Sequence, residues 1–362
     1  MATPSQEPSK RVDLVFQGGG IKGVALAGAL SVLEERGFQP QNVAGASAGA
    51  IIATLLAAGY TAKGLYELIT VENFGLFLDK GWEDRLPNFV SVPLSLWTGQ
   101  GIYEGEYFLK RMETLLAAKE VHTFRDLIHP DYAELPQTSI YRYKVQVIVS
   151  DITERRMLIL PRDADQLGVS PDDLNVARAV RMSMSFPIFF EPVRFPNPKT
   201  TKEHLLVDGG MLSNFPVWLF DSEGIPEWPT FGVRLVNENV ENPINVGLPW
   251  LDSTLKVLGP MGPFLVSLAS TALEAHDRTY LASADFVRTI TVPTLGVNTL
   301  DFSLAEDKIQ DLYNSGRKAA EEFLETWELE GFFEGYIKAF RSGEKYSRRR
   351  ELIAHVQEMA KS

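Results

Sequence analysis

Short apolar runs alternate with helical repeats along most of the chain. Runs of branched apolar side chains predict buried strands over residues 12–16, 144–150, 157–160, 231–236 and 287–292, with shorter strands at 43–44 and 205–207. Apolar positions at helical spacing predict helices over residues 23–36, 50–58, 103–119, 175–185 and 303–327. Strands and helices that alternate in this way indicate an α/β sandwich with a mostly parallel sheet.

The same pattern predicts how the chain divides. We expect a disordered, polar tail over residues 1–10, one domain over 11–331 and a helical, basic extension over 332–362. Residues 338–362 carry seven Lys or Arg and three Glu within a chain of net charge −12, so the remaining body is strongly acidic. The basic end is either a solvated helix end or a contact for an anionic membrane or acidic partner.

Composition removes several classes of function. The chain has no cysteine, so disulfides, cysteine–zinc sites and thiol nucleophiles are excluded, and its five histidines form no HxH or HExxH pair that would suggest a metal site. The acidic charge argues against binding a nucleic-acid polymer. Residues 1–10 lack the apolar core of a signal peptide, and the uncharged stretch 43–62 contains three glycines, so we expect no membrane-spanning helix there.

A first motif that carries chemistry is Gly45-Ala46-Ser47-Ala48-Gly49. A short strand precedes it and a helix that is apolar on all sides follows. This G-x-S-x-G pattern is typical of a nucleophilic serine on a sharp strand-to-helix turn, where flanking side chains would clash. The start of the following helix can also stabilise negative charge beside Ser47.

A second motif is the glycine loop Gly18-Gly19-Gly20-Ile21-Lys22-Gly23, which lies between a predicted strand and a predicted helix. Such a loop presents backbone N–H groups to an anion. The spacing also fits a dinucleotide fingerprint, but residues 39–44 lack the acidic residue that would bind a ribose. An oxyanion hole that serves Ser47 is therefore the better interpretation.

A third motif, Asp208-Gly209-Gly210, follows the strand at 205–207. A plain turn is the commoner role of an isolated D-G-G, but a serine nucleophile needs a base. His276 lies in a helical stretch, His355 lies near the C-terminus, and the polar neighbours of His204 suggest an exposed loop. Asp208 is the better candidate for the base.

Taken together, these motifs resemble the patatin-like phospholipase family over roughly residues 11–310. The segments 181–187 and 189–192, RMSMSFP and FFEP, strengthen the resemblance. It implies a three-layer α/β/α sandwich, a Ser47–Asp208 dyad, an oxyanion hole of Gly18, Gly19 and Gly20, and hydrolysis of lipid acyl esters without a metal or other cofactor. Residues that support these motifs are Lys22, Gly23, Gly45, Gly49, Gly209 and Gly210. Lys22 departs from the family, which often has arginine there. Lysine keeps the positive charge but lacks the planar guanidinium group of arginine.

The expected function is hydrolysis of fatty-acyl esters of membrane lipids, of the phospholipase A or lysophospholipase type. Alternatives on the same scaffold are a neutral-lipid or thioester hydrolase and a non-catalytic lipid-binding module. Similar bacterial proteins include effectors that a protein or a nucleotide switches on, and no motif identifies such an activator here. We expect a cytoplasmic protein that binds membranes peripherally, with secretion by a route without a signal peptide left open. Apolar side chains at 89–97 and 255–273 are candidate membrane contacts, with core packing as the alternative for both.

Overall fold

The computed structural model describes residues 10–71, 105–187, 190–221, 226–236, 288–297 and 304–329. Eight strands form one sheet in the order β5-β6-β3-β2-β1-β7-β8, and β4 pairs with β3. The strands are β1 (Arg11–Phe16), β2 (Gln39–Ala46), β3 (Val145–Asp151), β4 (Arg156–Leu160), β5 (Val193–Pro196), β6 (Glu203–Asp208), β7 (Thr230–Val236) and β8 (Thr289–Pro293). The main helices are α1 (Gly23–Glu35), α2 (Ala48–Ala57), α3 (Ala62–Val71), α5 (Glu106–Ala117), α6 (Val176–Ser183) and α10 (Glu306–Leu329).

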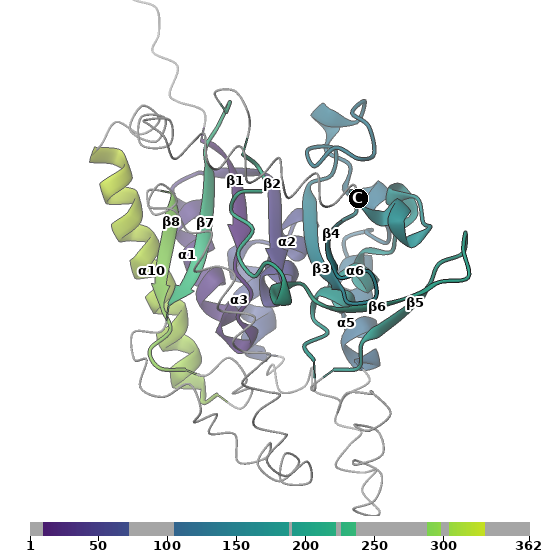
Figure 1. Cartoon of the computed structure of the whole chain (residues 1–362). Coiled ribbons are helices and arrows are strands. Elements are labelled where there is room, and N and C mark those ends of the chain that lie inside the picture. The colour runs from purple at the N-terminus through teal and green to yellow at the C-terminus, as the bar shows by residue number, and fades with distance from the viewer. Residues whose placement is uncertain are drawn as a thin grey trace, which may run out of the picture.

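The centre of the sheet is parallel. Strands β1, β2, β3, β7 and β8 pair in parallel, whereas β4, β5 and β6 are added in antiparallel pairs (Figure 1). The chain therefore has the expected three-layer α/β fold with a mostly parallel central sheet.

Alternation along the strands divides the core between the two faces of the sheet. Val12, Leu14 and Phe16 of β1 pack in a large cluster with α1, α2 and α10. Val15 faces the other way, into a smaller cluster that the segment 215–220 covers. Helix α2 is buried along nearly its whole length, as its apolar sequence predicts, and it holds the chain that leaves β2 firmly against the sheet.

Several expected boundaries shift. Strand β2 begins at Gln39 rather than residue 43, and α6 ends at Ser183 rather than residue 185. Helix α3 and strand β5 were not expected from the sequence. The following lie outside the described residues: residue 303, where the last helix was expected to begin, the apolar segments 89–97 and 255–273, and most of the two terminal segments.

Strand β3 places two strand ends beside each other. Its edge bonds to β2 over Val145–Ile148 and to β6 over Val149–Asp151. On the β3 side, both sets of bonds are made by even-numbered residues. Lys144 O accepts the Val43 N–H at 2.8 Å, and the Ile152 N–H donates to Leu205 O at 3.0 Å. Alternate residues of a strand direct their backbone groups to the same edge, so β2 and β6 lie one after the other along one edge of β3. Their carboxyl ends meet there.

Candidate active site

Ser47 occupies a strained turn between β2 and α2. Its backbone has φ 53° and ψ −128°, in the positive-φ region that residues with a side chain seldom adopt. Strain of this kind is retained where the surrounding structure enforces it and is concentrated at functional sites. The residue is partly exposed, whereas its neighbours Ala46 and Ala48 are buried. The turn predicted from G-x-S-x-G is therefore present, with Ser47 at its apex.

The glycines of this motif allow a close approach of backbones. A Cβ atom on Gly45 would lie 2.3 Å from the carbonyl carbon of Gly49, and one on Gly49 would lie 2.2 Å from the carbonyl oxygen of Phe16. Because backbone atoms cannot move aside as a flexible side chain can, both positions need glycine. At Ser47, therefore, the backbones of β1, β2 and α2 pack so closely that neither Gly45 nor Gly49 could carry a methyl group.

Asp208 reaches the same place from β6. In the register of the sheet, Ala46 lies opposite Ile148 and Asp208 lies opposite Val149, the next residue of β3. Because β2 and β6 share this edge, Ser47 and Asp208 extend from two strand ends that meet. Gly209 fits closely beside them, since a Cβ there would lie 2.1 Å from Ile148 O. The structure brings the predicted nucleophile and base together although 160 residues separate them in the sequence.

The Asp208 carboxyl is buried, with 1% of its surface exposed. Its Oδ1 accepts the Gly210 N–H at 2.8 Å, and its Oδ2 is buried without a hydrogen-bond partner among the described residues. Burial raises the pKa of Asp208 to about 7, and interactions with the Gly210 N–H and the Ser47 hydroxyl offset part of that rise. Near neutral pH this carboxyl can both accept and release a proton.

The glycine loop follows β1 and runs past Ser47. A Cβ on Gly18 would lie 3.0 Å from the Ser47 Cβ, so the loop and the serine are neighbours. The Gly18 N–H donates to Asn214 O at 3.0 Å, and Asn214 Nδ2 donates to Gly18 O at 3.3 Å. In contrast, the N–H groups of Gly19 and Gly20 have no acceptor among the described residues. Within the described part of the chain, two of the three glycines predicted for the oxyanion hole therefore have an N–H group that makes no hydrogen bond.

The supporting residues of the loop close it and connect it to α1. Gly20 has φ 57°, and the Lys22 N–H donates to Gly19 O at 3.2 Å. Gly23 begins α1, where an added Cβ would meet only the Ala48 Cβ at 3.5 Å, an ordinary contact. Gly23 is therefore a position where a small side chain would fit. At Gly45, Gly49 and Gly209, an added Cβ would clash with the backbone.

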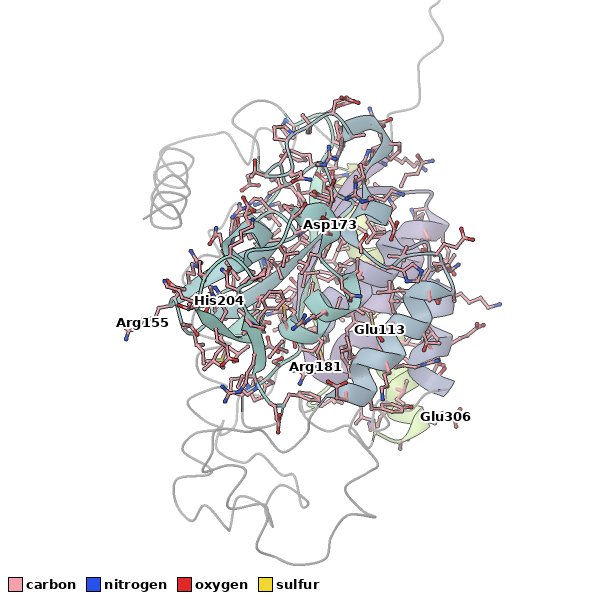
Figure 2. All side chains as sticks on the ribbon, turned by 90° about the vertical axis from the view of Figure 1, so that its right-hand side faces the viewer. Glu113, Arg155, Asp173, Arg181, His204 and Glu306 are labelled. Atoms are coloured by element: carbon pink, nitrogen blue, oxygen red, sulfur yellow. The ribbon has the colours of Figure 1, made fainter. Side chains whose placement is uncertain are left out.

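The end of α6 and the residues just after it contact both Ser47 and Asp208. The sequence pattern indicated no role for these residues beyond the family resemblance. Ser183 Oγ accepts the Ser47 N–H at 2.9 Å, Met184 Sδ lies 3.6 Å from Ser47 Oγ, and Ser185 O accepts the Asp208 N–H at 3.0 Å. Arg181, labelled in Figure 2, is buried and donates to Ser185 Oγ and to Glu191 O. The RMSMS segment is thus part of the site.

Among the described histidines, His204 does not lie in the setting that the sequence predicts. His204 is 2% exposed and lies within β6, with Nδ1 2.7 Å from Asp151 Oδ2 (Figure 2), so the expectation of an exposed loop is wrong. The polar neighbours that suggested exposure belong to a strand with one solvated side. His122 and His129 lie in the segment between α5 and β3, and His276 and His355 lie outside the described residues.

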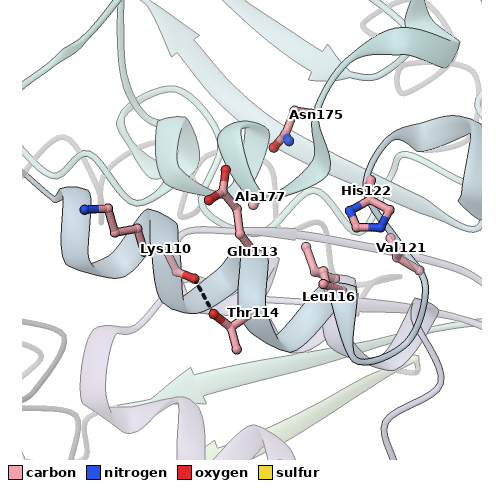
Figure 3. Close-up of a pocket in the computed structure, with 9 residues that line it drawn as sticks. Lys110, Glu113, Thr114, Leu116, Val121, His122, Asn175 and Ala177 are labelled. Carbon is pink, nitrogen blue, oxygen red and sulfur yellow. Dashed lines mark hydrogen bonds between the residues drawn. The ribbon is translucent and has the colours of Figure 1, made fainter.

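A cavity of about 460 Å³ opens elsewhere, between α5 and the start of α6. Figure 3 shows Lys110, Glu113, His122 and Asn175 among the residues that line it. The Asn175 side chain caps α6 by accepting the Arg178 N–H at 2.8 Å. The lining contains neither Ser47 nor Asp208, so this cavity is separate from the dyad.

No group of three His, Cys, Asp or Glu side chains that could hold a metal ion occurs in the described parts of the chain. Within the same residues, no helix has both the length and the apolar character required to cross a bilayer.

An α/β sandwich with a serine at positive φ between a parallel strand and a buried helix has the turn by which α/β hydrolases expose a nucleophile. Comparison with known proteins makes the relationship specific. The family model of patatin-like phospholipases matches residues 14–221, which include the glycine loop, Ser47 and Asp208. The chain belongs to the patatin-like phospholipase family.

Individual relatives agree with this assignment. The uncharacterized protein YqhO of Bacillus subtilis is 37% identical over 316 residues, which cover 87% of this chain and 99% of YqhO. The probable lipid hydrolase 463L of Invertebrate iridescent virus 6 is 26% identical over 216 residues, or 59% of this chain and 64% of 463L. Among solved structures, VipD from Legionella pneumophila matches with a TM-score of 0.51 and 19% identity, covering 88% of this chain and 67% of VipD. The VipD match concerns the fold alone.

Proposed function

We propose that this protein hydrolyses fatty-acyl esters of membrane lipids, with Ser47 as the nucleophile and Asp208 as its only side-chain base. The observation that carries the proposal is the meeting of two strand ends at one edge of β3, which sets a strained, partly exposed serine beside a buried carboxyl. Family membership and the name of the viral relative, a probable lipid hydrolase, support a lipid as the substrate.

In the first half of the reaction, Ser47 Oγ attacks the acyl carbonyl carbon while Asp208 accepts the hydroxyl proton. The unpartnered Oδ2 is the atom with capacity to accept it. When the tetrahedral intermediate breaks down, the alcohol leaves with the proton that Asp208 held, and the acyl group remains on Ser47. In the second half, water attacks this ester, Asp208 takes the proton of the water, and Ser47 recovers its hydroxyl as the fatty acid leaves.

Negative charge develops on the carbonyl oxygen in both halves. The N–H groups of Gly19 and Gly20 are loop donors that have no acceptor among the described residues, so we assign the oxyanion hole to them. Gly18 has a different part, because its backbone bonds to Asn214 fix the loop next to Ser47. The positive end of α2 adds a favourable field beside Ser47.

The substrate class is tested by the products. Purified protein is incubated with vesicles of mixed phospholipids, with a triacylglycerol emulsion and with an acyl thioester, with and without cell extract, and the products are identified by mass spectrometry. We expect free fatty acid and lysophospholipid from the vesicles, and none with Ser47→Ala. Release from the emulsion or thioester alone would show a neutral-lipid or thioester hydrolase. Lipid binding without any product, even with extract, would show a non-catalytic module.

If hydrolysis occurs only when cell extract is present, the protein needs a protein or nucleotide activator. Because the chain has to reach a lipid surface, we also propose peripheral binding to membranes, which the same vesicles report by co-sedimentation. Binding that is equal for Ser47→Ala and the wild-type protein would separate docking from chemistry.

A further inference from the structure

Ser183 takes a place in the sheet that the backbone would otherwise fill. Hydrogen bonds of a parallel pair recur at every second residue. The bond from Val43 N–H to Lys144 O begins such a series between β2 and β3. The series continues at Gly45, and its next bond would join the Ser47 N–H to Ile148 O. Strand β2 ends at Ala46, and in place of that last bond the Ser183 hydroxyl stands between the two backbone groups.

The hydroxyl satisfies both backbone groups. Ser183 Oγ accepts the Ser47 N–H at 2.9 Å and donates to Ile148 O at 2.6 Å. A hydroxyl can accept and donate at once, which the side chain of alanine cannot do. Ser183 itself is fully buried, with 0% of its surface exposed. Water therefore has no ready access to replace it.

Ile148 O is also the group against which the residue after Asp208 packs. A Cβ on Gly209 would lie 2.1 Å from this oxygen, so the Asp208-Gly209 turn rests on it. A single chain of contacts thus leads from the Ser47 backbone through the Ser183 hydroxyl to Ile148 O and to the turn that carries the base. Ser185, two residues after Ser183, adds a second contact. Its backbone oxygen accepts the Asp208 N–H and fixes the same turn from the α6 side.

We propose that Ser183 is a positioning residue for ester hydrolysis: its hydroxyl separates β2 from β3 at the last position of the ladder and so sets the Ser47 turn relative to Asp208. Without the hydroxyl, the Ser47 N–H either closes directly on Ile148 O or stays unsatisfied in a buried site. Either result moves the nucleophile with respect to its base. A displacement of about 1 Å in an active site can cost about 100-fold in rate.

The test measures covalent labelling of Ser47 by a fluorophosphonate probe, which needs no particular lipid. Ser183→Ala removes the hydroxyl, and Ser183→Cys fills the site with a slightly larger thiol that bonds only weakly. We expect both variants to be labelled about 10- to 100-fold more slowly than the wild-type protein. For a short soluble ester, kcat should fall in the same proportion, KM should stay constant, and the pH of half-maximal rate should not move.

Ser31→Ala is the matched control, because Ser31 is a buried serine on α1 whose hydroxyl donates to Gly28 O at 2.7 Å and accepts from Arg317 at 2.8 Å, and bonds to neither Ser47 nor Asp208. It should lose stability and keep the wild-type labelling rate, with all rates measured well below each variant's melting temperature. If Ser183→Ala does not fold, Ser183→Cys decides. Labelling of the Ser183 variants at the wild-type rate overturns the inference and leaves the proposed function intact. Absence of labelling in the wild-type protein itself would overturn the proposed function, on which this inference rests.

Discussion

Asp208 is the residue whose environment determines how the site works. An aspartate in water is ionised at neutral pH and is a weak base, whereas burial raises the pKa of Asp208 to about 7. A base with a pKa near the working pH combines a useful population of the charged form with a strong tendency to accept a proton. In the proposed mechanism, burial of the Asp208 carboxyl and its raised pKa therefore allow it to act as the base without a histidine.

The pH dependence of hydrolysis follows from this pKa. Only the ionised Asp208 can accept the Ser47 proton, so kcat/KM for a soluble ester should rise tenfold per pH unit below about pH 7 and level off above it. Initial rates between pH 5 and 9 provide the measurement. A rate that stays constant from pH 5 to 7 would mean that the base titrates near the ordinary pKa of an aspartate, contrary to the burial described here.

Gly19 allows the oxyanion hole to be tested separately. A Cβ there would lie 2.3 Å from Leu235 Cδ1, the far end of a flexible side chain, so Gly19→Val should fold while its N–H is displaced. Turnover should fall by about 100-fold or more, the scale of losing one oxyanion donor. Lys22→Arg is the control in the same loop and should change turnover little. Near-normal turnover in Gly19→Val would show that the loop is a structural turn only.

At the scale of single elements, the local pattern predicted strands β1, β3, β4, β7 and β8 and the helices around the site. It missed the amino half of β2, because Asn42 is polar yet buried, where its N–H donates to the Asp13 carboxylate. It also gave no sign that β6 would run antiparallel on the same edge of β3 as β2. That arrangement arises from tertiary packing, because β6 pairs with residues of β3 that lie 55 to 59 positions earlier and meets β2, which lies more than 150 positions earlier.

The site shows the same division. Ser47 and Asp208 were predictable, because motifs with a fixed local geometry carry them. The engagement of the Gly18 N–H by Asn214 was not, since it depends on a segment almost 200 residues away. Ser183 stood in a recognised motif, but its role depends on the end of the β2–β3 ladder, which the sequence does not mark.

Close packing of elements around the serine turn predicts different outcomes for two glycine substitutions. Gly49→Ala forces a methyl group to within 2.2 Å of Phe16 O and should cost more than about 3 kcal/mol of stability. Gly23→Ala meets only the Ala48 Cβ at 3.5 Å and should be neutral or stabilising by up to about 1 kcal/mol. Denaturant unfolding of both variants provides the comparison. Equal stabilities would contradict the close approach of β1 and α2 at this turn.

At the scale of the whole molecule, the proposed function requires an acidic body to act on a lipid surface. The net charge of −12 opposes binding to anionic vesicles, so attraction has to come from apolar contacts or from the basic residues of 338–362. In the sequence, one of the apolar segments proposed for this contact (89–97) lies between α3 and α5, and the other (255–273) lies between β7 and β8. The contribution of these segments to lipid contact is measured as the rate of vesicle hydrolysis divided by the rate of soluble-ester cleavage.

Chemistry by serine and aspartate does not require a metal ion. Hydrolysis of a short soluble ester should therefore continue at its full rate in excess EDTA, which a continuous assay can follow. The soluble ester is essential to this experiment, because an ion could still assist adsorption to a vesicle. Complete loss of soluble-ester hydrolysis, with recovery on adding one particular ion, would require a different mechanism.

Ser47 and Asp208 form one catalytic unit in this account, and a double-mutant cycle on soluble-ester hydrolysis tests that claim most directly. Asp13→Asn is the control, because Asp13 is another buried carboxyl whose pKa burial raises to about 7, at the opposite end of β1 from the glycine loop. The account predicts that Ser47→Ala, Asp208→Asn and the double variant fall to the same residual rate, while Asp13→Asn keeps wild-type activity. Activity that survives Asp208→Asn, or that disappears in His204→Asn instead, would contradict it.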